Sequence, residues 1–150
     1  MSIANEPACY LLVRKYGKLL FVMRSNTGFM DGKYSLPAGH VEAEETYSAG
    51  ATREAFEEVG LHIEKAKIKH VFTLHRHSDD SHPVWTDVFF EVTDWAGEPV
   101  NNEPHKHSSL AWFDDSSLPD SIMDYQLYAL TQIAAGESYG EFGWPVAETD

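Results

Sequence analysis

The sequence contains one cysteine, few basic residues and no long apolar run. Because Cys9 is alone, no disulfide can form within the chain, so cysteine usage gives no sign of an oxidising compartment. Cys9 lies in an apolar run, and we expect it to be a small buried side chain. No apolar run approaches the roughly 18 residues that a membrane span needs. The start of the chain also lacks the basic and apolar regions of a signal peptide. We therefore expect a cytoplasmic protein without a membrane partner.

Basic residues are scarce, since 11 Lys and Arg stand against 24 Asp and Glu, which gives a formal net charge of −13. Such a chain repels the phosphate backbones of DNA and RNA, so we expect no polymeric nucleic-acid partner. A small anionic substrate would also be repelled unless a cation accompanied it, which agrees with a metal-dependent phosphate enzyme. No repeat, low-complexity segment or linker divides the 150 residues, and we expect residues 1–150 to form a single domain.

The hydrophobic pattern predicts a helix over residues 46–59 that ends at Gly60, a residue able to adopt positive φ. An i, i+3, i+4, i+7 series predicts its buried face, and its members are Thr52, Ala55, Phe56 and Val59. Gly50 inside this helix costs about 1 kcal/mol relative to Ala, which suggests close packing at that point.

An adjacent face of the same helix carries Glu54, Glu57 and Glu58 at i, i+3, i+4 spacing. Like charges at this spacing destabilise an isolated helix by roughly a few tenths of a kcal/mol per pair. Arg53 can offset one of them by pairing with Glu57 four residues on. A hard divalent cation would compensate the others, because Mg²⁺ prefers carboxylate oxygens and keeps waters that substrate phosphates can replace. The alternative interpretation is an acidic helix face in water.

The surrounding stretch, residues 39–61, fits the spacing Gly-x5-Glu-x7-Arg-Glu-U-x-Glu-Glu-x-Gly-U, where U is apolar. The matching positions are Gly39, Glu45, Arg53, Glu54, Ala55, Glu57, Glu58, Gly60 and Leu61. This stretch resembles the signature box of the Nudix hydrolases. The resemblance implies a mixed sheet sandwiched between helices. It also implies hydrolysis of nucleoside diphosphates linked to another moiety, including nucleoside triphosphates, with Mg²⁺ as cofactor and Mn²⁺ as a substitute.

The resemblance also implies roles for residues of the box. The expected metal ligands are the Gly39 carbonyl and the carboxylates of Glu54, Glu57 and Glu58. Arg53 would hold a glutamate such as Glu45 or Glu57 in place, and Glu45 would serve either metal binding or orientation. The general base stays open between a box glutamate, such as Glu54 or Glu57, and an acidic residue of a downstream loop.

Residues 101–106, followed by Trp112, resemble an Asn-x-Glu-Pro-x-Lys stretch of some Nudix nucleoside triphosphatases. Glu103 is therefore the downstream candidate for the general base, and Lys106 would pair with Glu103 or with a substrate phosphate. The alternative for Glu103 is a solvated loop carboxylate.

Substrate selection is expected from the polar loops at 24–34, 76–83 and 100–108. Phe29, Met30 and Tyr34 could line a base-binding pocket by stacking, or they could pack the first loop down. ADP-ribose and dinucleoside polyphosphate hydrolases of this family carry a Pro or a Tyr at a set distance past the box, where this chain has residues 76–78. The absence of that marker favours a nucleoside triphosphate, either an oxidised purine such as 8-oxo-dGTP or a pyrimidine. A nucleotide sugar or other diphosphate derivative is the first alternative, and a non-catalytic nucleotide-binding module is the second.

Outside the box, apolar runs predict five strands, at residues 8–14, 19–23, 63–75, 84–92 and 110–113, the third with a break around Lys65 and Ala66. The first two form a hairpin. A second helix is predicted over residues 121–135, capped by Ser121 and stopped by Gly136, with an apolar stripe at Met123, Leu127, Leu130 and Ala134. Two helices among several strands, without strict βαβ alternation, indicate the α+β class.

Two smaller groups of side chains complete the predictions. His75, His77 and His82 match no closed zinc spacing, and we expect them to be surface histidines rather than metal ligands. The aromatic residues near the C-terminus, Tyr139, Phe142 and Trp144, predict that part of the tail packs back on the domain.

Overall fold

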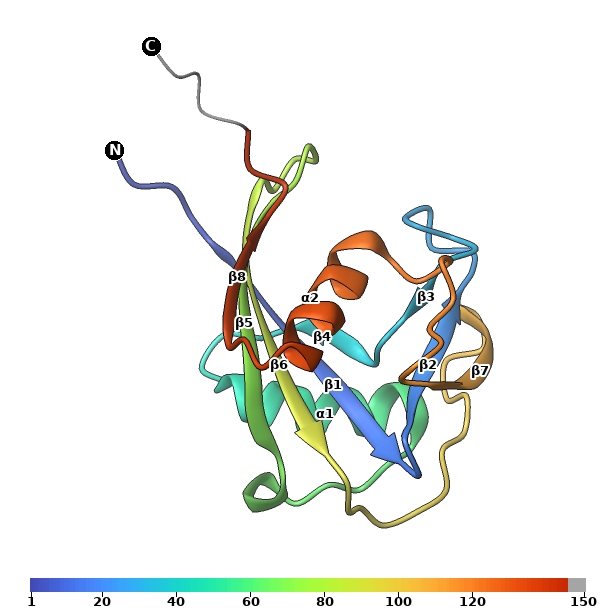
Figure 1. The fold of residues 1–150 in the computed structure, drawn as a ribbon. Helices are drawn as coiled ribbons and strands as arrows, with labels where there is room; N and C mark the ends of the chain where they lie inside the picture. Colours follow the sequence, from blue (N-terminus) through green and yellow to red (C-terminus); the bar gives the residue numbers. More distant parts are fainter. Residues whose placement is uncertain (146–150) are drawn as a thin grey trace.

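A computed structural model describes residues 1–145, and Figure 1 shows how its elements are arranged. In chain order the elements are β1 (Glu6–Lys15), β2 (Lys18–Arg24), β3 (Tyr34–Ser35), β4 (Ala38–His40), α1 (Tyr47–Val59), the 3-10 helix η1 (Lys65–Lys67), β5 (Lys69–His77), β6 (Val84–Val92), β7 (His107–Asp114), α2 (Asp124–Ala134) and β8 (Tyr139–Phe142). None of the helices in this part of the chain is long and apolar enough to cross a membrane.

Strand β1 is the centre of a mixed sheet in the order β3-β2-β1-β6-β5-β8. It runs parallel to β6 over eight residue pairs, from Glu6 opposite Trp85 to Val13 opposite Val92. It runs antiparallel to β4 near its start and to β2 near its end, while β7 pairs with β2. The predicted hairpin of β1 and β2 is confirmed. Its two turn residues, Tyr16 and Gly17, both have positive φ (53° and 74°), which matches the twist of a tight hairpin.

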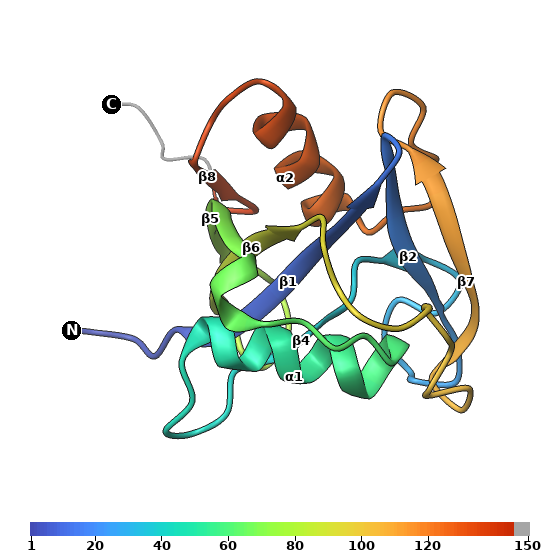
Figure 2. The same ribbon diagram turned by 90° about the horizontal axis from the view of Figure 1, so that it is seen from below.

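Both faces of β1 are buried, and its residues alternate between two hydrophobic cores. One core packs under α2 and takes Ala8, Tyr10 and Leu12 from β1. The other packs under α1 and takes Cys9, Leu11 and Val13. Figure 2 shows the two helices on opposite sides of the sheet, which confirms the predicted α+β class and the α/β/α sandwich. Cys9 is fully buried, as expected.

Helix α1 follows the prediction closely at its ends. The Thr46 hydroxyl accepts a hydrogen bond from the Ala49 N–H (3.1 Å), and Gly60 ends the helix with a left-handed φ of 71°. The predicted buried face is wrong at Phe56, which is 50% exposed and stacks on the ring of His62. The face that contacts the sheet consists of Gly50, Ala51, Ala55, Glu58 and Val59. Apolar spacing alone missed it because one of its members is a carboxylate.

Gly50 packs closely, as its cost in a helix suggested. A Cβ at this position would lie 2.9 Å from Glu45 Oε1 and 3.3 Å from Cys9 Sγ.

Helix α2 begins three residues later than predicted, at Asp124, and Ser121 does not cap it. Residues 121–123 are instead held by β3, since the Tyr34 N–H bonds to the Ser121 carbonyl (2.9 Å) and the Met123 N–H bonds to the Tyr34 carbonyl (3.0 Å). The buried face also differs from the predicted stripe. Ala134 is exposed, whereas Tyr125, Gln126, Ala129 and Leu130 are buried.

The predicted strand over 63–75 is displaced toward the C-terminus, because η1 occupies residues 65–67 and β5 extends to His77. Strand β8 was not predicted, and it pairs in parallel with β5. The Trp144 ring packs on His75 and His77 (centroids 4.5 and 5.1 Å), which confirms that the tail packs back. These two histidines are therefore half-buried, while His82 is exposed as expected.

Candidate active site

Helix α1 directs its glutamates toward β4. Glu58 is buried, and its Oε2 accepts a hydrogen bond from the Ala38 N–H (3.2 Å). The Glu54 carboxylate lies against Gly39, where a Cβ would come within 2.2 Å of the carboxyl carbon. A side chain at position 39 would therefore displace the Glu54 carboxylate from this place. Glu57, the third member, keeps a side chain that is 48% exposed.

Arg53 organises these carboxylates, as the box resemblance implied. Its Nε and one terminal nitrogen donate to the two oxygens of Glu45 (2.8 and 3.0 Å). The other terminal nitrogen donates to Glu54 (2.9 Å) and Glu57 (3.0 Å), and the His40 carbonyl accepts one further hydrogen bond (3.0 Å). All five donors of the guanidinium are thus used, which fixes the orientation of three glutamates at once.

Glu45 lies on the far side of Arg53, away from the other carboxylates. One of its oxygens also accepts a hydrogen bond from the Glu42 N–H (3.0 Å), and these contacts with Arg53 and Glu42 lower the pKa of Glu45. Because both oxygens are already occupied, the structure favours the orienting role over the metal-binding role that the sequence left open.

The buried glutamates carry a large electrostatic cost. Burial raises the pKa of Glu54 to about 7, against the lowering effect of Arg53, and Glu57 and Glu103 raise it further. Burial and the neighbouring Glu54 raise the pKa of Glu58 well above its ordinary value. The site therefore concentrates negative charge that Arg53 only partly neutralises.

The donor set fits a divalent cation. In residues 1–145 no three His, Cys, Asp or Glu side chains are already arranged as a metal-binding group, and Arg53 holds Glu54 and Glu57 while Glu58 bonds to Ala38. The carboxylates and the nearby Gly39 carbonyl nevertheless offer only oxygen atoms, which hard divalent cations prefer. A bound cation would also stabilise the ionised forms of Glu54 and Glu58, whose pKa values are raised without it. The residues that would hold it are Gly39, Glu54, Glu57 and Glu58.

These groups face a cavity of about 560 Å³, here named the acidic cavity. Its wall includes Glu54, Glu57, Glu58, Glu103, Arg24 and Lys106. The cavity therefore brings together Glu103 and the glutamates of α1, which lie 45 residues or more apart in the sequence.

The loop that carries Glu103 is tied to the end of α1. The Asn102 N–H donates to the Glu58 carbonyl (3.0 Å), and its side chain donates to the Phe56 carbonyl (3.1 Å). The Asn101 side chain accepts from the Glu103 N–H (3.2 Å), and Lys106 Nζ lies 3.6 Å from the Glu103 carboxylate. Glu103 is thus a held residue whose side chain is 21% exposed, rather than a freely solvated loop carboxylate.

His107, at the start of β7, also lines the acidic cavity and was not predicted. It is buried, and its Nδ1 has no hydrogen-bond partner among the described residues. Burial, with nearby Arg24 and Lys106, lowers its pKa to about 4, so the ring is neutral near pH 7. Its position directly after Lys106 was the only signal in the sequence.

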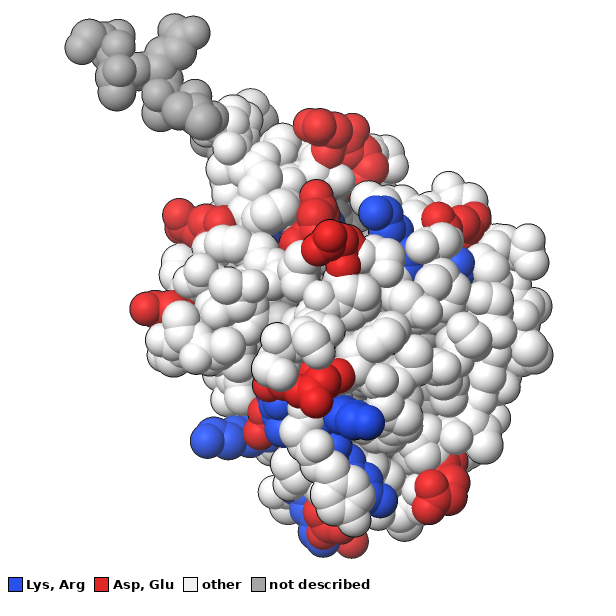
Figure 3. All heavy atoms as spheres, turned by 45° about the vertical axis from the view of Figure 1, so that its right-hand side comes forward, with Lys and Arg blue, Asp and Glu red and all other residues white. Residues whose placement is uncertain are grey.

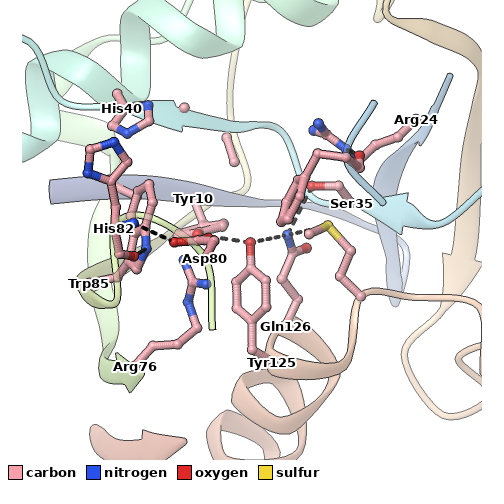
Figure 4. A pocket seen from close by; sticks show the side chains of 15 residues that line it. Tyr10, Arg24, Ser35, His40, Arg76, Asp80, His82, Trp85, Tyr125 and Gln126 are labelled. Carbon is pink, nitrogen blue, oxygen red and sulfur yellow. Dashed lines mark hydrogen bonds between the residues drawn. The ribbon is translucent and has the colours of Figure 1, made fainter. Parts of the chain in front are cut away.

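A second cavity of about 340 Å³, here named the aromatic pocket, adjoins the acidic cavity. Both cavities are lined by Arg24, Ala38, Gly39 and His40. Figure 4 shows side chains of its wall, among them Tyr10 from β1, Arg76 from β5, Trp85 from β6, and Tyr125 and Gln126 from α2. Phe29 of the first loop also lines this pocket.

A buried polar network forms the floor of the aromatic pocket. Arg76 Nε donates to Asp87 Oδ2 (2.6 Å), and the Tyr10 hydroxyl donates to Asp87 Oδ1 (2.9 Å). The guanidinium carbon of Arg76 lies 5.0 Å from the Trp85 ring centre and 3.9 Å from that of Tyr125. Burial raises the pKa of Asp87 despite the opposing effect of Arg76. Sequence reasoning missed this network, because its members are scattered and resemble ordinary strand residues.

The three predicted side chains of the first loop separate in the structure. Phe29 lines the aromatic pocket and is 44% exposed. Met30 is 41% exposed and lines a neighbouring hollow that also contains Phe29 and Tyr125. Tyr34 packs edge-on against Phe113 beside the core, and it is not among the residues that line these hollows. Of the two alternatives, stacking in a pocket fits Phe29 and packing fits Tyr34.

The fold and the cavities define a class of protein, an α/β/α sandwich whose helix α1 carries a cluster of carboxylates beside an aromatic pocket. The chain belongs to the Nudix family, since the family model of the NUDIX domain matches residues 6–130. The box predicted this family, and the match confirms it.

Two curated proteins show similarity in sequence. The 8-oxo-dGDP phosphatase NUDT18 of Homo sapiens is 29% identical over 106 residues, which cover 69% of this chain and 31% of that protein. A MutT-like protein of Streptomyces ambofaciens is 34% identical over 62 residues, which cover 41% of this chain and 38% of that protein. The match thus spans roughly a third of each relative's length.

Solved structures agree in fold. A MutT NUDIX hydrolase from Burkholderia pseudomallei superposes with a TM-score of 0.78 at 24% identity, covering 87% of this chain and 98% of that chain. A MutT protein from Methanosarcina mazei gives a TM-score of 0.76 at 18% identity, with coverage of 89% and 97%. At these identities the similarity establishes the fold alone.

Proposed function

We propose that this chain hydrolyses a phosphoanhydride bond of a nucleoside triphosphate, releasing a nucleoside monophosphate and pyrophosphate in a Mg²⁺-dependent reaction. The observation that carries this proposal is the junction of the two cavities along β4. An aromatic pocket suited to a base opens directly into a cavity lined by carboxylates, and four residues belong to both walls. A nucleotide spanning the junction would place its base and its phosphates in chemically matching surroundings.

The residues of the acidic cavity divide the work. Glu54, Glu57, Glu58 and the Gly39 carbonyl would hold Mg²⁺, which supplies neutralisation of phosphate charge and activation of water when bound. Mn²⁺ presents the same oxygen-seeking chemistry and is the expected substitute. Arg53 keeps Glu54 and Glu57 oriented, because its remaining donors are committed to Glu45 and to the His40 carbonyl.

Glu103 is the proposed general base for the attacking water. It faces the same cavity as the box glutamates, and it is not held by Arg53. Its anchored loop keeps the carboxylate within the cavity, which a base needs for proton transfer at hydrogen-bond distance. Lys106, on the same wall, would bind a phosphate oxygen when the substrate displaces it from Glu103.

Arg24 would contact the phosphate nearest the base. It lines both cavities, and its guanidinium carbon lies 5.5 Å from the ring centre of Phe29. A base stacked on Phe29 would therefore place its first phosphate next to a cation.

Among nucleotides, the names of the relatives support a substrate with an oxidised purine base. The human relative is named as an 8-oxo-dGDP phosphatase and several structural relatives as MutT proteins. The human name also supports a nucleoside diphosphate as a second candidate, whose hydrolysis would release a nucleoside monophosphate and phosphate.

A substrate panel with separate detection of phosphate and pyrophosphate tests the proposal. The panel contains 8-oxo-dGTP, 8-oxo-dGDP, the common triphosphates, ADP-ribose and a nucleotide sugar. We expect the fastest turnover with a triphosphate, with pyrophosphate as the product and complete loss of activity in EDTA. Faster cleavage of the nucleotide sugar or ADP-ribose would replace our assignment with the diphosphate-derivative alternative. Binding of nucleotides without turnover of any of them would indicate a binding module.

A further inference from the structure

A third cavity lies at the opposite end of β1 from the active site. Its volume is about 320 Å³, and its wall includes Lys15, Tyr16, Lys18, Trp95, Glu98 and Trp112, a group here named the indole slot. None of these residues lines the acidic cavity or the aromatic pocket. Lys15 is five residues along β1 from Tyr10 of the aromatic pocket, which is about 16 Å at the rise of a strand.

The two tryptophans of the indole slot line its wall and also pack against the core under α1. The rings of Trp95 and Trp112 are nearly parallel, with centroids 6.5 Å apart and planes inclined by 20°. Both are only partly buried, and Tyr16 at the tip of the hairpin is 90% exposed. Large aromatic faces left in water at the wall of a cavity are suited to stacking against another planar ring.

Two cations flank these rings. Lys15 Nζ lies 5.5 Å from the ring centre of Tyr16 and 6.0 Å from that of Trp95, and Lys18 lines the same cavity. In the part of the chain that the structure describes, neither lysine has a carboxylate within ion-pair distance, whereas nearby Arg14 and Lys67 do.

Two lysines in one cavity without an ion-pair partner among the described residues are unusual in this chain, because its formal net charge is −13. On the face of the molecule drawn in Figure 3, most of the visible basic side chains lie toward the lower end. Figure 1 places the turn between β1 and β2 at the same end. The slot therefore combines stacking surface with two lysines beside one carboxylate, Glu98, and the lysines complement the phosphate of an aromatic anion.

We propose that the indole slot binds a mononucleotide, separately from the active site. Its base would stack on the Trp95 and Trp112 surface, and its phosphate would be neutralised by Lys15 and Lys18. Glu98 would accept a hydrogen bond from an amino or ring N–H group of the base. The cavity volume falls within the range of roughly 300–1,000 Å³ usual for small-molecule sites. This inference goes beyond the proposed function, since a ligand here lies remote from the carboxylates of α1.

The four tryptophans provide the experiment, because they report on different places. Trp85 lines the aromatic pocket, Trp144 packs on β5, and Trp95 and Trp112 form the slot. The full chain is labelled with 5-fluorotryptophan, each ¹⁹F resonance is assigned with a single Trp→Phe variant, and GMP or AMP is titrated in EDTA. We expect saturable shifts of the Trp95 and Trp112 resonances, and the same shifts in the Glu57→Gln variant whatever its turnover.

Fragments and charge variants complete the test. Guanosine, which lacks the phosphate, and ribose 5-phosphate, which lacks the base, should each bind at least about tenfold more weakly than GMP. Lys15→Gln/Lys18→Gln should weaken the Trp95 and Trp112 response about tenfold and leave the Trp85 response unchanged. Lys65→Gln/Lys69→Gln is the matched control, since it removes the same charge from two other exposed lysines and should change neither response.

Three results would overturn the site. The first is no shift of the Trp95 and Trp112 resonances with GMP or AMP at up to about 5 mM, which would place any Kd above the millimolar range. The second is guanosine binding as tightly as GMP. The third is an equal loss of response in the two double-lysine variants. Failure of the proposed hydrolysis would appear in the substrate panel instead, so the two proposals stand or fall separately.

Discussion

The acidic cavity and the aromatic pocket adjoin along β4, but they are assembled in different ways. The acidic cavity takes three carboxylates from two turns of α1, and one arginine on the same helix orients two of them. The aromatic pocket takes its side chains from positions between Ala8 and Gln126. Its buried polar groups Tyr10 and Arg76 are hydrogen-bonded to Asp87 within the fold.

The two cavities also differ in electrostatic balance. In the aromatic pocket the buried charge of Arg76 meets that of Asp87 directly. In the acidic cavity, burial and neighbouring carboxylates raise the pKa values of Glu54 and Glu58. The charges of the aromatic pocket are thus paired within the fold, whereas under the proposed function the acidic cavity is completed by a cation and a substrate. Variants in the two cavities should therefore fail in different ways.

The largest expected effect is the loss of turnover in Glu57→Gln and Glu58→Gln. Each change removes a charged oxygen from the proposed metal site, and we expect kcat to fall by about 10³-fold or more. Both variants should fold, because glutamine is isosteric and Glu57 is half-exposed. Steady-state kinetics with a thermal melt would measure both properties. Glu64→Gln, at an exposed position outside the cavity, is the charge-matched control. Activity within about tenfold of normal in both variants would remove the metal-site assignment.

Glu103→Gln should have a smaller effect that separates a base from a metal ligand. We expect kcat to fall by about 10- to 100-fold, a typical contribution of a positioned base, with an unchanged Mg²⁺ concentration at half-maximal rate. A Mg²⁺ titration of the initial rate in variant and parent measures both. A rate restored by excess Mg²⁺ would make Glu103 a metal ligand, and an unchanged rate would make it a bystander on the cavity wall.

The same contrast explains what could be predicted from the sequence. The acidic cavity could be predicted from the sequence because its glutamates recur at helical spacing, and a single helix fixes their relative positions. Glu103 was found through a short resemblance, and its contact with the box depends on Asn102 bonding to Glu58, which no periodicity shows. Most strands were predictable because a run of apolar residues, such as the continuously buried run in β1, is a local signal. The sandwich itself was implied by the family resemblance of the box.

The aromatic pocket could not be predicted, because its residues become neighbours only through the tertiary fold. Tyr10, Asp87 and Tyr125 belong to three elements, and each is of a type that also fills ordinary cores. Strand β8 was missed for a related reason. It is four residues long, and its pairing with β5 is non-local. Phe56 and Ala134 were misplaced because an apolar residue next to a buried face keeps the helical period without reaching the core.

Without metal, the protein should lose stability as the pH rises from about 4.5 to about 7. In this window the folded state holds protons on Glu54 and Glu58 that the unfolded state releases, because burial raises their pKa values. We expect the free energy of unfolding to fall over this window, because the protons retained on the two glutamates stabilise the folded state only at lower pH. His107 has a lowered pKa and contributes with the opposite sign.

The contribution of the glutamates is isolated by comparing the parent with Glu58→Gln, which keeps His107. Urea unfolding in EDTA at pH 5 and pH 8 should show the smaller pH dependence in the variant. Mg²⁺ should stabilise the parent more at pH 8 than at pH 5, because cation and proton compete for the same carboxylates. Equal stabilisation at both pH values would show that the cation binds elsewhere.

The smallest expected effect concerns two aromatic residues of the first loop that the structure separates. Phe29→Ala should raise KM about fivefold with little change in kcat, because one stacking surface is worth about 1 kcal/mol. Its stability should hardly change, since Phe29 is 44% exposed. Tyr34→Ala should behave in the opposite way, losing about 3 kcal/mol of stability from the contact with Phe113 while KM stays constant. Steady-state kinetics gives KM for both variants, and urea unfolding gives their free energies of unfolding. A raised KM in Tyr34→Ala together with a normal KM in Phe29→Ala would mean that the base occupies the other side of the loop, and the junction of the two cavities would lose its role in substrate binding.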